Sequence, residues 1–322
     1  MLGGDGAPDV VADAVAQSVS SSGPDLLLVG PAARTAQLLA ERGIADDPRI
    51  TYLEAQRAVP MDGDALRVVR EFKDVSVRVA ANAVAIGAAD ACVSAGHSGA
   101  AVAASVFELG RTQGVQRPPL AVVLPALAGP VVLLDVGAGT TASVGLIEQF
   151  ALVGAAYARA LGIDDPVVGL LTIGSEPGKG DELRKDADPA LRALLALAGV
   201  RYTGGVEGFD VALGERAQVI VTDGFTGNVL LKGIEGTVLW SAESMGAAYA
   251  EKAPALGVAA AVAASDFAGG VLLGVNGVSV IAHGAATPEA IAACIRLAER
   301  AVNGSLVDRT KLLMSQLLGR TA

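Results

Sequence analysis

Short runs of apolar and β-branched residues alternate with longer Ala-rich stretches along nearly the whole chain. Such runs indicate buried strands and the Ala-rich stretches indicate helices, so the alternation is typical of βα units around a mainly parallel sheet. The sequence therefore predicts an α/β protein. Strands are expected at residues 25–29, 50–54, 90–94, 120–124, 131–136, 167–172, 218–222 and 278–282.

Most of the predicted strands end in a loop of small residues, many of them glycines. In open α/β sheets, ligands bind beyond the carboxyl ends of the strands, where such loops meet the N-termini of helices. We therefore expect the turns at Gly96, Gly178 and Gly227 to gather in one cleft that forms the active site.

A long Ala-rich helical region extends from Thr226 to Ser265, and Pro254 and Gly257 are expected to divide it. Its second part, residues 253–264, carries no charge and is too short to span a bilayer. Two interpretations stay open for it: a buried or dimer-interface helix, or an apolar ridge that touches a membrane. We predict a single α/β domain over residues 1–322, with a helical excursion at 226–268 and no transmembrane helix. Residues 306–320 are expected to form a basic amphipathic helix or a fraying tail.

The net charge of −10 argues against a nucleic-acid binder, because affinity for a phosphate backbone comes from Lys and Arg. The same charge opposes any anionic substrate at long range, so binding must depend on local cations and oriented backbone N–H groups. Cys92 and Cys294 are too few for a disulfide framework, and no leader resembling a signal peptide opens the sequence. A reducing cytoplasm is expected, with both thiols serving as inert packing.

The sharpest local feature is the segment 219–232, in which a buried strand passes through a loop with two glycines straight into a helix. Thr226 or Asn228 can cap that helix while free N–H groups near Gly224 and Gly227 face an anion. An ordinary βα turn is the alternative interpretation.

The loop at residues 94–100 has the same design, since small residues follow a strand and hydroxyls stand at the start of a helix. Phosphate is again the natural ligand. His97 is either an acid or base that titrates near neutral pH or simply a hydrogen-bonding group.

A third loop, at residues 173–185, combines glycines with Lys179, Arg184 and Lys185 near a strand end. The glycines allow close approach of the backbone to a ligand, and the three cations supply positive charge. A solvated surface loop explains the pattern equally well.

Other chemistries have little support in the sequence. The segment Gly137-Ala138-Gly139-Thr140-Thr141-Ala142 matches a dinucleotide fingerprint, but no clear acidic residue ends a strand about 20 residues later. The chain has no H-E-x-x-H, no paired C-x-x-C and no G-x-S-x-G pattern. We expect no cofactor and no metal.

The chain also carries an ordered set of short segments that together extend over nearly its whole length. They are Gly3 to Pro8, Asp90 to Gly96, Arg117 to Ala121, Gly169 to Leu171, Lys179 to Leu183, Gly205 to Gly208, Asp223 to Lys232, Leu272 to Gly277 and Ala282 to Gly284. This ordered set resembles the phosphate acyltransferase family.

The resemblance implies a three-layer α/β/α fold akin to the phosphotransacetylases and isopropylmalate dehydrogenases. It also implies a cytoplasmic homodimer with peripheral membrane contact through the helical region after Thr226. The implied reaction makes acyl phosphate from acyl-acyl carrier protein and inorganic phosphate for phospholipid synthesis. Such a reaction needs no covalent enzyme intermediate, because phosphate itself attacks the thioester carbonyl.

The resemblance also suggests roles for particular residues. Lys179 or Lys185 is expected to neutralise charge on phosphate or on the oxyanion, and Asn228 to donate to the oxyanion. Asp5 and Glu207 are expected to organise loops, whereas His283 either binds phosphate or orients a loop. The residues expected to bind substrate are Gly4, Asp5, Ser94, Gly96, His97, Ser98, Gly99, Glu207, Asp223, Gly224, Thr226, Gly227, Asn276 and His283.

The chain departs from the family pattern at several points. Family members carry a short strand of the type I-A-V-D-A before the Gly-Gly-Asp motif, where this sequence reads Met1-Leu2. His97 and Ser98 replace an Asn-Thr pair, and Ile281 replaces a lysine. Three alternatives therefore accompany the main hypothesis: a phosphotransacetylase-like enzyme that uses short acyl-CoA, a non-catalytic paralogue that acts as a scaffold, and an NAD-linked dehydrogenase.

Overall fold

A computed structural model describes residues 1–20, 23–60, 64–249 and 269–319 of the chain. It divides into two compact units. Unit 1 comprises Met1–Arg111 and Gly269–Asn303, and unit 2 comprises Thr112–Ala268 and Gly304–Ala322. Each unit therefore combines segments that lie far apart in the sequence.

The strands of unit 1 form two groups. Strands β1 (Leu26–Gly30) and β2 (Ile50–Glu54) form a parallel pair. Strands β3 (Ala91–Ser94), β10 (Val278–Ile281) and β9 (Gly270–Leu272) follow one another in the order β3-β10-β9. β3 and β10 are parallel, whereas β10 and β9 are antiparallel.

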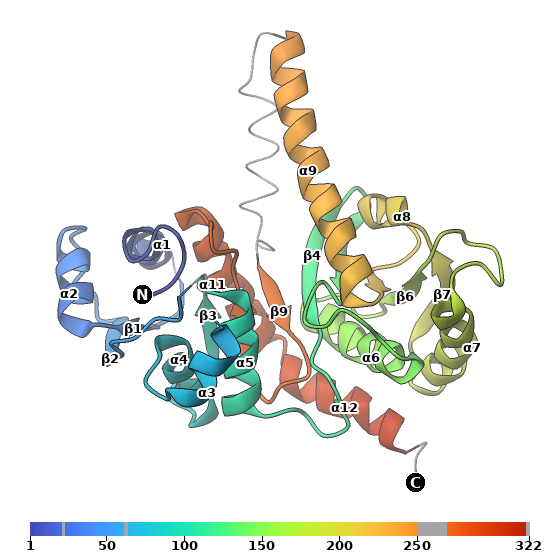
Figure 1. Cartoon of the computed structure of the whole chain (residues 1–322), viewed down its shortest axis with the longest axis horizontal. Coiled ribbons are helices and arrows are strands. Elements are labelled where there is room, and N and C mark those ends of the chain that lie inside the picture. Colours follow the sequence, from blue (N-terminus) through green and yellow to red (C-terminus); the bar gives the residue numbers. More distant parts are fainter. Residues whose placement is uncertain (21–22, 61–63, 250–268, 320–322) are drawn as a thin grey trace. The chain divides into compact units, whose positions relative to one another are not determined.

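Helices from both ends of the chain cover these strands. They are α1 (Asp9–Ser20), α2 (Ala32–Ala40), α3 (Ala65–Glu71), α4 (Ser76–Ala85), α5 (Ser98–Leu109) and α11 (Pro288–Asn303). Helix α1 packs against α11, and α4 packs against α5 (Figure 1). Buried residues of α1, α2, β1 and β2, such as Val15 and Leu39, form one apolar cluster that joins the first elements of the unit.

Unit 2 contains a five-membered run of strands at its centre. The run consists of β4 (Leu120–Ala126), β5 (Gly129–Leu134), β8 (Val219–Val221), β6 (Val167–Leu171) and β7 (Arg201–Val206), in that spatial order. β4 and β5 form an antiparallel hairpin, and the other neighbours are parallel. The carboxyl ends of β5, β8, β6 and β7 therefore lie along one edge of the sheet.

The helices of unit 2 are α6 (Val144–Ala160), α7 (Glu182–Leu197), α8 (Gly208–Leu213), α9 (Gly224–Tyr249) and α12 (Leu306–Leu318). Helix α6 is buried along most of its length, because α7, α12, β5 and β8 all pack against it. This position explains why its sequence is apolar apart from Glu148, Gln149 and Arg159. Since α12 buries Leu313 and Met314, residues 306–318 form a packed helix rather than a fraying tail.

The structure confirms the predicted α/β class with a mainly parallel arrangement, and each predicted strand overlaps an observed one. Strands β7 and β9 are not among the strands predicted from the sequence. β7 begins with Arg201 and includes Gly204 and Gly205, so it has no continuous apolar run. β9 spans only three residues. Both are strands because neighbouring strands supply their hydrogen-bond partners, which a local pattern does not reveal.

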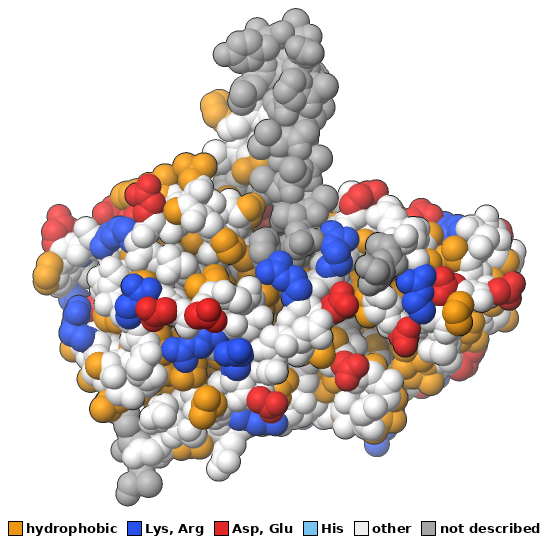
Figure 2. Space-filling model, turned by 180° about the vertical axis from the view of Figure 1, so that it is seen from behind, with side chains coloured by type: hydrophobic (Ala, Val, Ile, Leu, Met, Phe, Trp, Pro, Cys, Tyr) orange, Lys and Arg blue, Asp and Glu red, His pale blue; other side chains and the backbone are white. Residues whose placement is uncertain are grey.

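Helix α9 follows β8 directly and accounts for the first part of the predicted helical excursion. The predicted division near Pro254 and the uncharged stretch 253–264 lie outside the described residues. Within the described part of the chain, no helix combines the length and apolar character that crossing a membrane requires. On the face shown in Figure 2, acidic and basic side chains of the described residues are interspersed.

Candidate active site

In unit 1, three predicted segments meet at the carboxyl ends of β3 and β10. The N–H of Asp5 donates to the carbonyl of Gly284 (2.8 Å). Gly4 has a φ of +97°, and a Cβ there would lie 2.7 Å from the carbonyl oxygen of Ala95 and 3.2 Å from that of Gly284. Only glycine permits this conformation and this approach. The structure thus brings together the predicted residues Gly4 and Asp5 with the loops that follow β3 and β10.

The two histidines of the chain both serve as local hydrogen-bond acceptors. His97 precedes α5, and its Nδ1 accepts from the N–H of Gly99 (3.1 Å) as a helix cap. His283 Nδ1 accepts from the N–H of Ala285 (3.2 Å). Each ring therefore orients its own loop through Nδ1. These contacts support the hydrogen-bonding interpretation of His97 and the loop-orienting interpretation of His283.

The remaining predicted residues of unit 1 also hold loops. Ser94 Oγ accepts from the N–H of Gly96 (3.3 Å), which tightens the turn before α5. Asn276 Nδ2 donates to the carbonyls of Leu109 (3.3 Å) and Arg111 (3.2 Å) and so fixes the end of α5. Ser98 and Gly99 are the first residues of α5. Their expected contacts with substrate stay a prediction.

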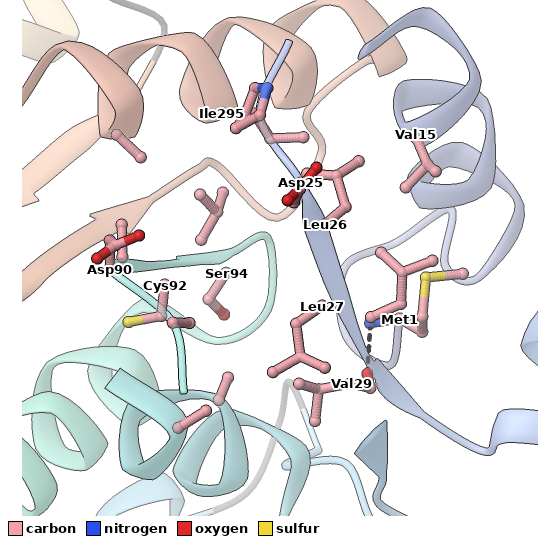
Figure 3. Close-up of a pocket in the computed structure, with 18 of the residues that line it drawn as sticks. Met1, Val15, Asp25, Leu26, Leu27, Val29, Asp90, Cys92, Ser94 and Ile295 are labelled. Atoms are coloured by element: carbon pink, nitrogen blue, oxygen red, sulfur yellow. Dashed lines mark hydrogen bonds between the residues drawn. The ribbon is translucent and has the colours of Figure 1, made fainter. Parts of the chain in front are cut away.

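Unit 1 also has a cavity of about 640 Å³, partly open to solvent, between β1 and β3 (Figure 3). β1 pairs with β2 and β3 pairs with β10, so one edge of each strand faces this cavity instead of another described strand. The amino group of Met1 donates to the carbonyl of Val29 (2.9 Å), and burial lowers the pKa of this amino group to about 6. Of the predicted binding residues, Ser94 lines the cavity. Its walls combine aliphatic side chains, such as Ala298, with polar ones, such as Asp90, and its volume leaves room for a larger side chain at Ala298.

The cysteines are packing residues. Cys294 is fully buried in α11, and burial raises the pKa of its thiol to about 12. Burial also raises the pKa of the Cys92 thiol in β3. Neither thiol forms a reactive thiolate at neutral pH.

In unit 2, a buried carboxylate organises the loop between β5 and α6. Asp135 is 1% exposed. Its carboxylate accepts from the N–H groups of Leu120, Gly137, Ala138 and Gly139 at 2.9–3.0 Å. Burial is the main influence on this group and raises its pKa, while the four N–H donors act in the opposite direction. The amides that a dinucleotide pyrophosphate would need in this loop are thus already bonded to Asp135, which argues against the NAD alternative.

The β8–α9 loop lies against this organised loop. A Cβ on Gly227 would lie 1.9 Å from the carbonyl oxygen of Asp135, and one on Gly224 would lie 1.9 Å from that of Gly139. The two glycines therefore allow the first turn of α9 to touch the backbone of the β5–α6 loop. Asn228 adds a side-chain link, because its Nδ2 donates to the carbonyl of Val136 (3.0 Å).

The helix cap differs from the prediction. Asp223, rather than Thr226 or Asn228, caps α9, since its Oδ1 accepts from the N–H of Thr226 (2.9 Å). α9 begins at Gly224, so Asn228 stands more than one turn inside the helix. Within the described residues, the N–H groups of Gly224 and Phe225 have no acceptor, as expected for the first turn of a helix.

Arg184 was predicted from the sequence only as nearby positive charge, and in the structure it has a central position. It lies in the first turn of α7 and is 8% exposed. Its guanidinium donates to the carbonyl of Leu171 (3.3 Å) and to the side chains of Asp181 (2.9 Å), Thr222 (2.8 Å), Asp223 and Thr226 (3.4 Å). Arg184 thus joins the ends of β6 and β8 to the starts of α7 and α9. The spacing Asp181-x-x-Arg184 at a helix start was the available sequence signal.

The predicted lysines have looser surroundings. Lys179 is exposed in the loop after β6, and Lys185 is exposed in α7 next to Arg184. Glu207 precedes α8, where its N–H donates to Asp210 (2.8 Å) as part of a capping box. A Cβ on Gly205 would lie 3.4 Å from the carbonyl oxygen of Gly174, so the ends of β6 and β7 also adjoin.

The predicted shared cleft involves both units. Gly96 belongs to unit 1, whereas Gly178 and Gly227 belong to unit 2. A single cleft formed by all three turns stays a prediction. Within unit 2, the loops after β5, β8, β6 and β7 form one continuous set of contacts at the edge of the sheet.

The chain is similar to proteins of known name over nearly its whole length. The model of the family described as "Fatty acid synthesis protein" matches residues 1–309. A phosphate acyltransferase of Desulfitobacterium hafniense is 38% identical over 322 residues, which cover 96% of this chain and 95% of that protein. A phosphate acyltransferase of Thermus thermophilus is 40% identical over 327 residues, covering 98% and 97%.

Solved structures resemble this chain at lower identity. A phosphotransacetylase from Streptococcus pyogenes has a TM-score of 0.62 and 18% identity, covering 93% of this chain and 91% of that one. The EutD phosphotransacetylase from Staphylococcus aureus has a TM-score of 0.55 and 12% identity, covering 91% and 99%. At these identities the likeness shows the fold alone.

Proposed function

The chain belongs to the phosphate acyltransferase family, and from this premise we propose that it makes acyl phosphate from acyl-acyl carrier protein and inorganic phosphate for phospholipid synthesis. The observation that carries the proposal is the identity of 38–40% to phosphate acyltransferases over nearly the full length of the chain. The arrangement of the β8–α9 loop supports it from the chemical side. That loop offers an anion two unbonded N–H groups at a helix N-terminus.

The proposed reaction balances without an enzyme-bound intermediate. An oxygen of hydrogen phosphate attacks the thioester carbonyl, and a new C–O bond forms in a tetrahedral oxyanion. The oxyanion collapses, the C–S bond breaks, and the departing carrier thiolate takes up the proton that phosphate loses. The protein therefore contributes positioning and charge stabilisation more than acid–base chemistry.

The side chains of unit 2 suggest how this help is given. Asn228 Nδ2 uses one of its two hydrogens on the carbonyl of Val136, which fixes the amide and leaves a second N–H for the oxyanion. The exposed ammonium groups of Lys179 and Lys185 are mobile cations that neutralise charge on phosphate or on the oxyanion. These local groups oppose the long-range repulsion expected from a net charge of −10.

The activity test compares two acyl donors. The purified chain is incubated with phosphate and either acyl-acyl carrier protein or a short acyl-CoA, and acyl phosphate is trapped with hydroxylamine as the hydroxamate. We expect product that requires phosphate and forms faster from the carrier-protein donor. Faster turnover of acyl-CoA would favour the phosphotransacetylase-like alternative. A folded protein that gives no acyl phosphate from either donor would refute the enzyme proposal and favour a scaffold.

A variant tests the role of Asn228. Asn228→Ala is expected to lower turnover at saturating phosphate by roughly 100- to 1,000-fold, the usual effect of removing one oxyanion donor. Thr237→Ala is the matched control, because Thr237 is an exposed residue of the same helix whose hydroxyl only donates back to Gly233 (2.8 Å). Turnover of the Asn228 variant within about threefold of the parent would contradict the assigned role.

Assembly is part of the same proposal. Leu239 and Trp240 in α9 are 64% and 70% exposed, which is unusual for large apolar side chains on one helix. Their exposure supports a contact of this helix with a second copy of the chain or with a membrane surface. Light scattering coupled to gel filtration tests for the homodimer, and sedimentation with anionic lipid vesicles tests for peripheral membrane contact. A protein that stays monomeric and does not sediment with the vesicles would contradict both the homodimer and the membrane contact.

A further inference from the structure

The end of α9 that offers N–H groups to an anion also carries a negative side chain. Asp223 caps the helix, with Oδ1 accepting from the N–H of Thr226 (2.9 Å) and Oδ2 accepting from its hydroxyl (2.8 Å). Gly224 and Phe225, whose N–H groups are unbonded, follow directly in the chain. A carboxylate in this position stabilises the helix but repels phosphate at the same helix end.

Arg184 is the cation that faces this carboxylate. The guanidinium reaches Oδ2 of Asp223 from α7, and both side chains are about one-tenth exposed. The same nitrogen, Nη2, donates to Thr222 and Thr226, so the pair is fixed on both sides of the turn. Asp181 binds the other nitrogen, Nη1, but its side chain is 60% exposed, so solvent weakens its hold on the positive charge.

We propose that Arg184 is a positioning residue for phosphate: it cancels the charge of Asp223 while holding that carboxylate as the cap of α9. The inference rests on the proposed function and adds a specific role to a residue of the same site. Without Arg184, the cap remains but its negative charge acts on the incoming anion. With Arg184, the helix end keeps its cap and its affinity for an anion.

Besides α7, the β5–α6 loop brings a charged group to this turn. This group is Asp135, because a Cβ on Gly224 would lie 2.7 Å from its Oδ2. Four N–H groups solvate that carboxylate, whereas Asp223 receives one N–H, one hydroxyl and the guanidinium. Arg184 is therefore the full positive charge in direct contact with the cap. The hydrogen bonds from Thr226 and Arg184 keep the pKa of Asp223 below its usual value against the opposing effect of burial.

The test is a double-mutant cycle on phosphate binding. Isothermal titration calorimetry with inorganic phosphate at fixed ionic strength gives Kd for the parent, Arg184→Met, Asp223→Asn and the double variant. Asn is as good a helix cap as Asp, so Asp223→Asn removes charge without removing the cap. Arg192→Met is the control, because Arg192 lies on the same helix with its side chain 62% exposed.

The cycle has a clear expected result. Arg184→Met should weaken phosphate binding about tenfold, and the double variant should bind within about threefold of the parent, since the charge that Arg184 opposes is gone. Asp223→Asn alone should bind phosphate more tightly than the parent. The Arg192 variant should match the parent. A purely structural Arg184 gives the opposite pattern, with the double variant at least as weak as Arg184→Met.

Two controls separate the role of Arg184 from effects on folding and on activity. Thermal melts followed by circular dichroism establish which variants fold. If the variants that lack Arg184 do not fold, the phosphate Kd of Asp223→Asn compared with that of the parent decides the role of Arg184. Weaker phosphate binding by Asp223→Asn would overturn the inference. A parent that binds phosphate yet makes no acyl phosphate refutes the proposed function, and the cycle on phosphate binding still tests the role of Arg184. A parent that binds no phosphate refutes both.

Discussion

Replacing Gly227 by alanine gives the most direct test of the contact between the β8–α9 loop and the β5–α6 loop. A Cβ at this position would lie 1.9 Å from the carbonyl oxygen and 3.0 Å from the carbonyl carbon of Asp135. Both atoms are backbone, so no side chain can rotate away, and one loop must shift. Overpacking of this kind costs about 1–3 kcal/mol, whereas alanine gains about 0.5–1 kcal/mol over glycine inside a helix. We expect a net loss of roughly 1–2 kcal/mol of stability on this basis.

Gly236 provides a matched control in the same helix. A Cβ there would meet nothing within 4 Å, and the residue is exposed. Gly236→Ala should therefore stabilise the protein by about 0.5–1 kcal/mol. Urea unfolding followed by circular dichroism measures both changes, and the trapped-hydroxamate assay measures the phosphate KM. For Gly227→Ala we also expect the phosphate KM to rise by about tenfold, because the N–H groups of the first turn move with the loop.

The refuting result is specific. If Gly227→Ala is as stable as Gly236→Ala and keeps the parental phosphate KM, the first turn of α9 does not depend on its close approach to Asp135. The geometry proposed for the phosphate site would then be wrong.

Three further predictions concern the cavity, the lysines and the thiols. Ala298 lines the cavity of unit 1, so Ala298→Leu should lower the free energy of unfolding in urea by less than about 1 kcal/mol. Ala156 is buried in α6, so Ala156→Leu should lower it by about 1–3 kcal/mol. Equal losses would mean that the cavity is already filled. Lys185→Ala should lower kcat/KM for phosphate roughly tenfold at low salt, and by a smaller factor at high salt, because salt screens the charge. Lys311→Ala is the control and should leave kcat/KM unchanged, because it removes only an ammonium that pairs with Asp308 of the same helix. A loss in the Lys185 variant that does not depend on salt would contradict a charge role. Burial raises the pKa of Cys294 to about 12, so little of its thiol is ionised at pH 8. Alkylation of Cys294, followed by peptide mapping, should therefore be slow in the folded protein and fast in urea. Rapid alkylation in the folded protein would contradict the burial of this thiol.

The fold could be predicted where strands of this chain are buried on both faces. β8 consists of fully buried apolar residues such as Ile220, and the last four residues of β5, which include Val132, are also fully buried, so both runs are continuous in the sequence. β7 could not be found in this way, since its residues include Arg201 and two glycines. Its position is set by pairing with β6, a partner more than 30 residues away in the sequence, and a local pattern carries no information on such pairing.

The candidate site could be predicted in its loops but not in its side-chain contacts. The glycines of the β8–α9 loop were recognisable because a strand, two glycines and a helix follow one another directly. The role of Asp135 in the β5–α6 loop could not be predicted, because a single acidic residue after an apolar run can serve many different roles. Arg184 was named only for its charge, since its bond to Asp223 joins residues 39 positions apart. Such contacts depend on which strand ends are neighbours, and the spatial order of the strands is not written in any one segment.

The two carboxylates at this edge of unit 2 are the reason why we expect an anion to bind in one loop and not in the other. Asp135 is bonded to the N–H groups of Gly137, Ala138 and Gly139, so the β5–α6 loop has no free donors to offer at these positions despite its Gly-Ala-Gly sequence. Asp223 engages only the N–H of Thr226, and its charge is met by Arg184, so the N–H groups of the first turn stay unbonded. The dinucleotide-like loop thus supports its neighbour, and we expect the β8–α9 loop to be the binding element. If phosphate were found on the β5–α6 loop instead, the bonds of these amides to Asp135 would have to break first, which at about 1–3 kcal/mol for each unsatisfied group makes that outcome the less stable one.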